Sequence, residues 1–220
     1  MNKLNKRLFF PLAYLFAFMC AVFFTPSSAH ADEEDIQEIK QRLVLGKADS
    51  PIEIYIVSDW FCSSCKKLEP KIEQLYTALK SKAAFYFVDF PINRQSANFS
   101  PYHLSFLINE KPKYLTARQS LMDLTDETQK PTDIDVAKLA KTKKLKFEEL
   151  SFEDVKNGTE FFDDIVKRYS ISATPSVVVV NKETEKFEKF KGSQAKEKTI
   201  LEAIDKLEGK TKPKKSWFSF

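Results

Sequence analysis

An apolar strand that runs directly into two closely spaced cysteines constrains this chain more than any other feature. Residues 52–57 (IEIYIV) have the composition of a buried strand, and Ser58-Asp59 closes it with a polar turn. Cys62 and Cys65 come next, three positions apart. A helical pattern then begins, with apolar residues on one face at Leu68, Ile72, Leu75, Tyr76 and Leu79. The order of strand, cysteine pair and helix places Cys62 at a helix N-terminus.

A cysteine at the start of a helix has altered chemistry. The unpaired backbone N–H groups and the helix dipole favour a thiolate over a thiol, which makes Cys62 the predicted nucleophile. Cys65 lies one turn further on, where it can attack a mixed disulfide that Cys62 has formed. The dipeptide between them, Ser63-Ser64, is neutral. The pattern predicts a thiol–disulfide exchange site with Cys62 and Cys65 as its catalytic residues.

The first 31 residues have the organisation of a signal peptide. Three cations precede an uncharged apolar run over residues 8–24, and Ala29-His30-Ala31 is a small-x-small cleavage pattern. Cleavage there leaves residues 32–220, a length typical of one domain, and predicts a periplasmic or otherwise exported protein. If the segment stays uncleaved it is a membrane tether, because the apolar run is near the shortest length that spans a bilayer.

Removal of this leader changes what the composition means. The leader carries three cations and no acid, so the formal net charge falls from +4 to +1, and nothing indicates a nucleic-acid partner. Cys62 and Cys65 are then the only cysteines, and a disulfide that closes so short a loop stabilises little. His103 is the only histidine left, and the sequence has no glycine-rich phosphate loop. We therefore expect no metal and no cofactor beyond the redox-active cysteine pair.

The rest of the chain alternates between strand and helix patterns. Residues 32–50 form a charged N-terminal segment with a short helix, and the helix after Cys65 contains Pro70, which should kink it. Further strands are predicted at residues 83–90, 176–180 and 186–190, and helical patterns at about 98–168 and at 195–207. This order predicts an α/β domain over residues 51–208, with a small mixed sheet and an inserted helical subdomain.

At these residues the chain resembles the thioredoxin superfamily, and within it the exported DsbA-like thiol:disulfide oxidoreductases. The resemblance rests on Cys62-Ser63-Ser64-Cys65 after a strand, on Pro70 five residues later, and on Thr174-Pro175 before another strand, and it covers residues 51–207. It implies a thioredoxin-like fold in which Pro175 is cis and lies beside the cysteine pair. It also implies that the backbone of Thr174 pairs with an extended substrate chain, and that the helical block is the inserted subdomain of these proteins.

Two departures from the family pattern concern the chemistry. Such oxidoreductases usually have a buried acid six residues before the first cysteine, where this chain has Ile56. Glu53 and Asp59 are the acids that could take its place. No histidine stands between the cysteines, so the Cys62 thiolate should be less stabilised than in DsbA. Together with Thr174 before the proline, this implies a couple that leans towards reductase rather than oxidase.

Two aromatic residues next to Cys62 are candidate substrate contacts. Trp60 and Phe61 could form an apolar rim for partly unfolded protein substrates, or they could simply pack inside the domain. His103 has no partner evident in the sequence, and we expect it at a helix surface or a cap rather than in catalysis. The predicted partners are proteins that carry thiols or disulfides and a further redox protein that resets the pair. A monomer is expected, because residues 32–50 are too short for a dimerisation domain.

A second class of function remains open from the sequence. The chain could be a thioredoxin-like chaperone or binding module whose cysteine pair is structural, or a Cu(I) carrier, since soft thiolates suit Cu(I). Copper carriers often add Met or His ligands, and residues 32–220 contain only Met122 and His103 of these types. The basic, aromatic-ended residues 209–220 are predicted to be a disordered tail, with docking to a membrane surface or a partner as the other interpretation.

Overall fold

A five-stranded mixed sheet occupies the centre of the computed structural model, which describes residues 33–210. The strands are β1 (Leu45–Gly46), β2 (Ile52–Ser58), β3 (Ala84–Asp89), β4 (Ser176–Asn181) and β5 (Lys186–Lys191). They lie in the order β1-β3-β2-β4-β5, with β2 and β3 parallel and every other neighbouring pair antiparallel. The predicted signal peptide and most of the predicted tail lie outside the described residues.

The burial of the strands follows their sequences. Every residue of β2, β3 and β4 is buried, as expected for continuous β-branched and aromatic runs covered on both faces. β5 is largely exposed and rich in lysine, which suits an edge strand and discourages pairing with another chain. β1 has only two residues, too few for a hydrophobic period, and the sequence did not predict it.

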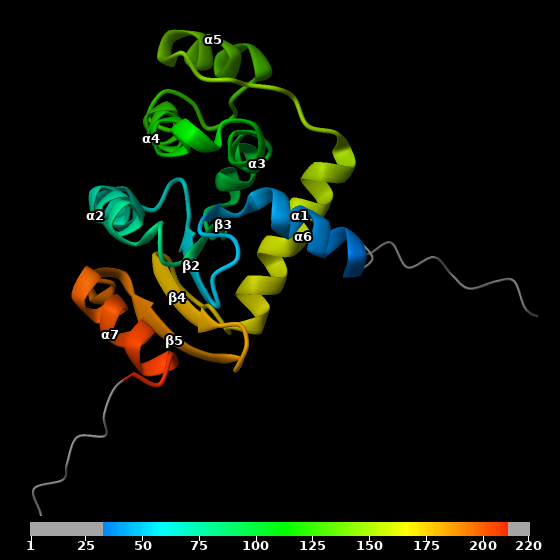
Figure 1. The fold of residues 1–220 in the computed structure, drawn as a ribbon. Coiled ribbons are helices and arrows are strands. Elements are labelled where there is room, and N and C mark those ends of the chain that lie inside the picture. Colours follow the sequence, from blue (N-terminus) through cyan, green and yellow to red (C-terminus); the bar gives the residue numbers. More distant parts are fainter. Residues whose placement is uncertain (1–32, 211–220) are drawn as a thin grey trace, which may run out of the picture. The chain divides into compact units, whose positions relative to one another are not determined.

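Seven α-helices and three short 3₁₀ turns accompany the sheet in the described part of the chain. The helices are α1 (Glu33–Leu43), α2 (Ser63–Leu79), α3 (Ser100–Asn109), α4 (Tyr114–Leu124), α5 (Asp133–Lys143), α6 (Phe152–Arg168) and α7 (Glu197–Leu207). The 3₁₀ turns are Arg94–Phe99, Lys111–Lys113 and Gly192–Gln194. Helices α1 and α6 cover one face of the sheet, α2 and α7 cover the other, and α3, α4 and α5 gather at one end (Figure 1). Within residues 33–210, no helix is both long and apolar enough to cross a membrane.

The predicted fold class, an α/β domain with a mixed sheet and an inserted helical part, is confirmed. The order of elements after the cysteine pair is the predicted one. Helix α6 differs from its neighbours in the helical block, because it packs against α1 and β3, and an ion pair between Arg42 and Asp154 joins it to α1. It therefore belongs to the layer that covers the sheet, while α3, α4 and α5 form the part that stands at the sheet's end.

One glycine is required by a close approach of two backbones. Gly46 has φ +73°, and a Cβ atom there would lie 2.7 Å from the carbonyl oxygen of Ala83 and 3.0 Å from that of Lys80. Gly209 has nearly the same φ, +72°, but nothing lies within 4 Å of the position that its Cβ would take. At both positions an L residue would have a strained backbone. Only at position 46 would its Cβ atom also clash with neighbouring atoms.

The change Gly209→Ala should cost about 1 kcal/mol of unfolding free energy, from left-handed backbone strain alone. Gly46→Ala should cost about 3 kcal/mol, because the added methyl group also clashes with two backbone carbonyl oxygens, those of Ala83 and Lys80. Urea unfolding of both variants measures the difference. Equal losses would show that the contact with Ala83 and Lys80 is not what requires glycine at position 46.

Candidate active site

Cys62 is the N-cap residue of α2, as the sequence predicts. Its backbone is extended (φ −78°, ψ 114°), and its carbonyl accepts hydrogen bonds from the backbone N–H groups of Cys65 at 3.0 Å and Lys66 at 3.1 Å. Its Sγ lies 3.8 Å from the carbonyl oxygen of Thr174, and the side chain is partly exposed. At this helix start the sulfur is therefore partly open to solvent and also contacts a loop that is far away in the sequence.

The two thiols have opposite acidities. Burial raises the pKa of the Cys65 thiol to about 12, and this side chain is 0% exposed. Partial burial also tends to raise the pKa of Cys62, but hydrogen bonds from Cys65, Thr174 and the backbone of Ser64 outweigh it and lower that pKa below the ordinary value. Both cysteines are free in this structure. Cys62 is thus the group that ionises, and Cys65 keeps its proton.

A loop 112 residues further along the chain faces the cysteines. The Thr174–Pro175 peptide bond is cis, as the family resemblance implies, and its Thr174 carbonyl makes the contact with Cys62. The carbonyl of Pro175 accepts a 2.8 Å hydrogen bond from the backbone N–H of Gly192, and Ser176 Oγ donates to the carbonyl of Ala173 at 2.7 Å. These bonds hold the loop in place between β4 and the end of β5.

A groove runs beside the cysteine pair and opens to solvent. It has a volume of about 480 Å³ and lies between α2, the cis-proline loop and the segment that follows β5. Ser64 and Leu68 contribute from α2, and Thr174 and Pro175 contribute from the loop. Any chain that reaches Cys62 along this groove passes the backbone of Thr174.

The two aromatic residues have different environments. Trp60 is 2% exposed; it packs against Phe99 and against the edge of His103, with ring centroids 6.0 and 5.2 Å apart, so it cannot form the apolar rim considered from the sequence. Its neighbour Phe61 is partly exposed and meets the ring of Phe99 edge-on at 5.6 Å. Of the two, Phe61 alone remains a candidate for substrate contact.

Neither acid suggested in place of the missing one is free to take that role. The carboxylate of Asp59 accepts hydrogen bonds from the N–H of Phe61 at 2.8 Å, from the backbone and side chain of Asn93 at 2.7 and 2.9 Å, and from Ser96 Oγ at 2.8 Å. Glu53 is paired with Lys40 and Tyr55 near the start of β2, about 16 Å from its end by the rise of a strand. Asp59 instead fixes two loops, and Ile56 is fully buried among apolar residues.

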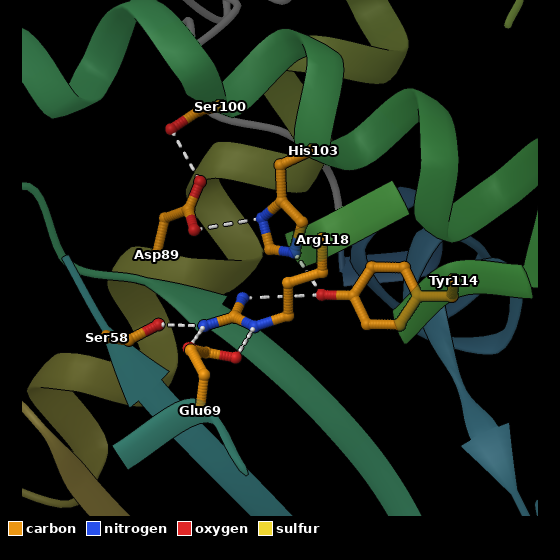
Figure 2. Close-up of polar contacts among 7 residues, drawn as sticks. All are labelled: Ser58, Glu69, Asp89, Ser100, His103, Tyr114 and Arg118. Atoms are coloured by element: carbon orange, nitrogen blue, oxygen red, sulfur yellow. Dashed lines mark hydrogen bonds and ion pairs between the residues drawn. The ribbon is translucent and has the colours of Figure 1, made fainter. Parts of the chain in front are cut away.

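A buried guanidinium pairs with an acid of α2, the helix that carries Cys65 (Figure 2). Arg118 of α4 is 1% exposed, and it donates to Glu69 through Nε at 2.9 Å and Nη2 at 2.7 Å, and to Ser58 Oγ through Nη2 at 2.7 Å. Burial tends to lower the pKa of Arg118, but the Glu69 carboxylate outweighs this and holds it above its ordinary value. Glu69 comes four residues after Cys65, one turn further along α2 and on the same side of the helix.

A chain of polar contacts continues from Arg118 to the end of β3. Tyr114 OH lies 3.4 Å from Arg118 Nη1 and 2.7 Å from His103 Nε2; His103 Nδ1 lies 2.9 Å from Asp89 Oδ1, and Ser100 Oγ donates to Asp89 Oδ2 at 2.8 Å (Figure 2). His103 is 0% exposed, so the expectation of a surface or capping residue is wrong. Both of its ring nitrogens are engaged inside the domain.

The sequence contained one usable signal for this network. Arg118 falls between Tyr114 and Leu121 at helical spacing, which is a core-facing position and an unusual place for a lone cation unless it is paired. Its partner Glu69 is 49 residues away, so the pair itself could not be identified. No group of three or more His, Cys, Asp or Glu side chains in residues 33–210 is arranged to hold a metal.

Comparison with known proteins identifies the family. The sequence profile described as "Thioredoxin" matches residues 38–206, which is more than half of the chain. The protein belongs to the thioredoxin family. A search of curated proteins found no match.

Solved structures of several other proteins have the same fold as this thioredoxin-family protein. DsbA2 from Pseudomonas aeruginosa has a TM-score of 0.55 at 20% identity, over 80% of this chain and 97% of its own. A thioredoxin-like oxidoreductase from Silicibacter pomeroyi has a TM-score of 0.57 at 17% identity, over 83% and 100%. The thiol-disulfide exchange protein α-DsbA2 from Wolbachia pipientis has a TM-score of 0.52 at 17% identity, over 79% and 94%. The fold is therefore that of the DsbA-type oxidoreductases.

The opposite acidities of the two thiols predict selective alkylation. At pH 7 iodoacetamide should modify Cys62 and leave Cys65 untouched in the folded, reduced protein, because only Cys62 is both exposed and ionisable there. The rate at Cys62 should rise with pH along a titration whose midpoint lies below that of a free cysteine. Mass spectrometry of tryptic peptides measures both. The change Cys65→Ala should move the midpoint upwards, since it removes a hydrogen bond to the thiolate.

Unfolded protein provides the control, because both cysteines should react there at similar rates. Equal modification of Cys62 and Cys65 in the folded protein would contradict the arrangement of one reactive and one protected sulfur.

Removal of the buried guanidinium should destabilise the domain strongly. Arg118→Met should cost about 3–5 kcal/mol, because Glu69 is left as an uncompensated buried charge. The double variant Arg118→Met/Glu69→Leu should recover at least half of that loss. Arg168→Met, which breaks an exposed pair with Asp164, is the matched control and should cost less than about 1 kcal/mol.

Urea unfolding followed by circular dichroism measures all three variants. A double variant no more stable than Arg118→Met alone would show that the uncompensated charge is not the cause of the loss.

Proposed function

We propose that this protein is an exported thiol–disulfide oxidoreductase in which Cys62 exchanges disulfides with protein substrates and Cys65 resolves the intermediate. One observation carries the proposal: a partly exposed sulfur with a lowered pKa lies one turn from a buried sulfur with a raised pKa, opposite a cis-proline loop. The fold and the family point to the same chemistry. One of the similar structures is itself described as a thiol-disulfide exchange protein.

The exchange balances as two successive substitutions at sulfur. The Cys62 thiolate attacks one sulfur of a substrate disulfide, so that a Cys62–substrate bond forms, the substrate S–S bond breaks, and the released thiolate takes a proton. Cys65 then gives up its proton and attacks Cys62 Sγ, which releases the second substrate sulfur as a thiolate that is protonated in turn. The substrate gains two electrons and two protons, and the protein is left with a Cys62–Cys65 disulfide.

The surroundings of Cys62 suit an extended, partly unfolded substrate. The cis-proline loop offers the backbone of Thr174 for pairing with a substrate strand, which gives affinity without strict choice of sequence. Phe61, which precedes Cys62 in the chain, adds a partly exposed apolar surface. The pair is proposed to need no cofactor, the protein to act as a monomer, and a separate redox protein to restore the starting state.

The working direction is proposed to be reduction. The residues between the cysteines are serines, so no cation in the dipeptide stabilises the Cys62 thiolate further. A less stabilised thiolate makes the reduced form a better electron donor, and Thr174 before the proline resembles the reductase and isomerase branch of the family. Export rests on the leader pattern of residues 1–31, with an uncleaved membrane tether as its variant.

Two other functions, a binding module with a structural cysteine pair and a Cu(I) carrier, have less support. A third ligand for Cu(I) would have to come from Met122 or His103, but Met122 is buried in the core, and His103 is engaged by Asp89 and Tyr114. A purely structural pair would not need a partly exposed sulfur with a lowered pKa. Exchange chemistry uses both properties.

Substitution of each cysteine separates the two roles. Insulin reduction is measured with dithiothreitol present to regenerate the reduced protein. Cys62→Ser should abolish the protein's contribution to this reaction, because no nucleophile remains. Cys65→Ser should stall after the first step and accumulate a mixed disulfide with the substrate, visible as a mass adduct that a reductant removes. Insulin reduction by Cys62→Ser at the wild-type rate would overturn the assignment.

The reduction potential of the Cys62–Cys65 couple tests the direction. Equilibration with glutathione should place it nearer the value of thioredoxin, about −270 mV, than that of DsbA, about −120 mV. A value close to that of DsbA would show an oxidase instead and leave the exchange site itself intact.

A further inference from the structure

The groove beside the cysteine pair is positively charged. Three of the residues that line it are lysines, Lys67 and Lys71 on α2 and Lys191 at the end of β5, and none is an acid. All three lysines are exposed. Among the residues that line the groove, these lysines carry the only formal charges.

The three lysines that line the groove have no carboxylate partner among the described residues. Lys66 pairs with Asp126 at 2.6 Å, Lys206 pairs with Glu188, and Lys189 donates to the carbonyl of Tyr169 at 2.8 Å. By contrast, no carboxylate of the described residues lies within 4.0 Å of the ammonium groups lining the groove, at Lys67, Lys71 and Lys191. Their charge is left for a group outside the domain.

The lysines also follow the line that a bound chain would take. Ser64, Lys67 and Lys71 are spaced three and seven residues apart on one side of α2, which puts the lysines about 4.5 and 10.5 Å along the helix from Ser64. An extended peptide advances about 3.3 Å per residue. Cys62 precedes Ser64 by two residues, so Lys67 and Lys71 lie about 7.5 and 13.5 Å along the helix from Cys62. They therefore lie opposite positions about two to four residues from a substrate cysteine held at Cys62.

The opposite wall is fixed in position. Lys191 precedes Gly192, whose backbone N–H donates to the carbonyl of Pro175 at 2.8 Å, so the end of β5 is tied to the cis-proline loop. A substrate strand paired with Thr174 thus has a lysine on each side. Charge complementarity then favours carboxylates on that strand.

Resting on the proposed exchange reaction, we propose that this groove selects extended substrate segments that carry Asp or Glu within about four residues of the reactive cysteine. The occupant is an acidic stretch of a partly unfolded protein. Each exposed ammonium–carboxylate pair should raise the exchange rate about twofold, so that three together give about a tenfold preference at low salt. The preference should shrink with added salt, because exposed charges are screened.

Matched peptide disulfides test the selection. Two peptides of equal length carry one cysteine flanked by either three Glu or three Lys residues, each as a mixed disulfide with 2-mercaptoethanol, and the neutral bis(2-hydroxyethyl) disulfide serves as reference. The rate constant for reduction by reduced protein is measured for each at low and high salt. The groove variant is Lys67→Gln/Lys71→Gln/Lys191→Gln. The control removes the same number of charges from α5, away from the groove: Lys138→Gln/Lys141→Gln/Lys143→Gln.

For each protein variant, the rate constant for the Glu peptide is divided by that for the Lys peptide. The two peptides differ in intrinsic reactivity, but this difference is the same for every variant, so a change in the ratio between the wild type and the groove variant reports on the groove alone. The ratio should fall about tenfold in the groove variant and stay at the wild-type value in the α5 control. A ratio that is the same in the wild type and the groove variant, or that falls equally in the control, would overturn the selection by the groove. Failure of the wild type to reduce even the neutral disulfide would instead overturn the proposed exchange function.

Discussion

A guanidinium enclosed by the domain connects the parts on which the candidate site depends. Arg118 joins α4 to the active-site helix through Glu69 and to the end of β2 through Ser58, while its charge lies over the rings of Trp60 and Phe87 at 5.2 Å. A buried cation is tolerated only when such contacts replace its water. The helix that carries both cysteines is therefore held against the sheet and the inserted helices at the same point.

The chemistry of the two sulfurs follows from where that helix begins. Cys62 caps the helix and accepts hydrogen bonds from Cys65 and from the backbone of Ser64, which stabilise its thiolate, whereas Cys65, one turn inside, is surrounded by the core. Between the lowered pKa of Cys62 and that of a free cysteine, the folded reduced protein binds fewer protons than the unfolded chain. Its stability therefore rises with pH across that window. The same position that makes this sulfur reactive also favours the reduced, folded state.

The sequence predicted the structure best where the pattern within a single segment determines that segment's conformation. The β-branched runs of β2 and β4 and the cysteine spacing of α2 predict the sheet and the reactive helix, because periodicity and helix-end effects are local. Contacts between distant residues could not be read in this way. Glu69 and Arg118 are 49 positions apart, and Trp60 is buried because Phe99 and His103 cover it. Glu53 and Asp59 looked equally available in the sequence, and only the folded chain shows that both carboxylates already have partners.

The bonds of Asp59 have a consequence for how such a domain can be altered. One carboxylate holds the turn just before the cysteines through Phe61, and it also holds the segment that leads into the inserted helices through Asn93 and Ser96. The turn before the cysteines and the segment before α3 are thus held by the same carboxylate. A shortened protein without residues 93–143 would lose Asn93 and Ser96 together with α3, α4 and α5, and Asp59 would no longer brace the turn before the cysteines, so the insertion is not a detachable module.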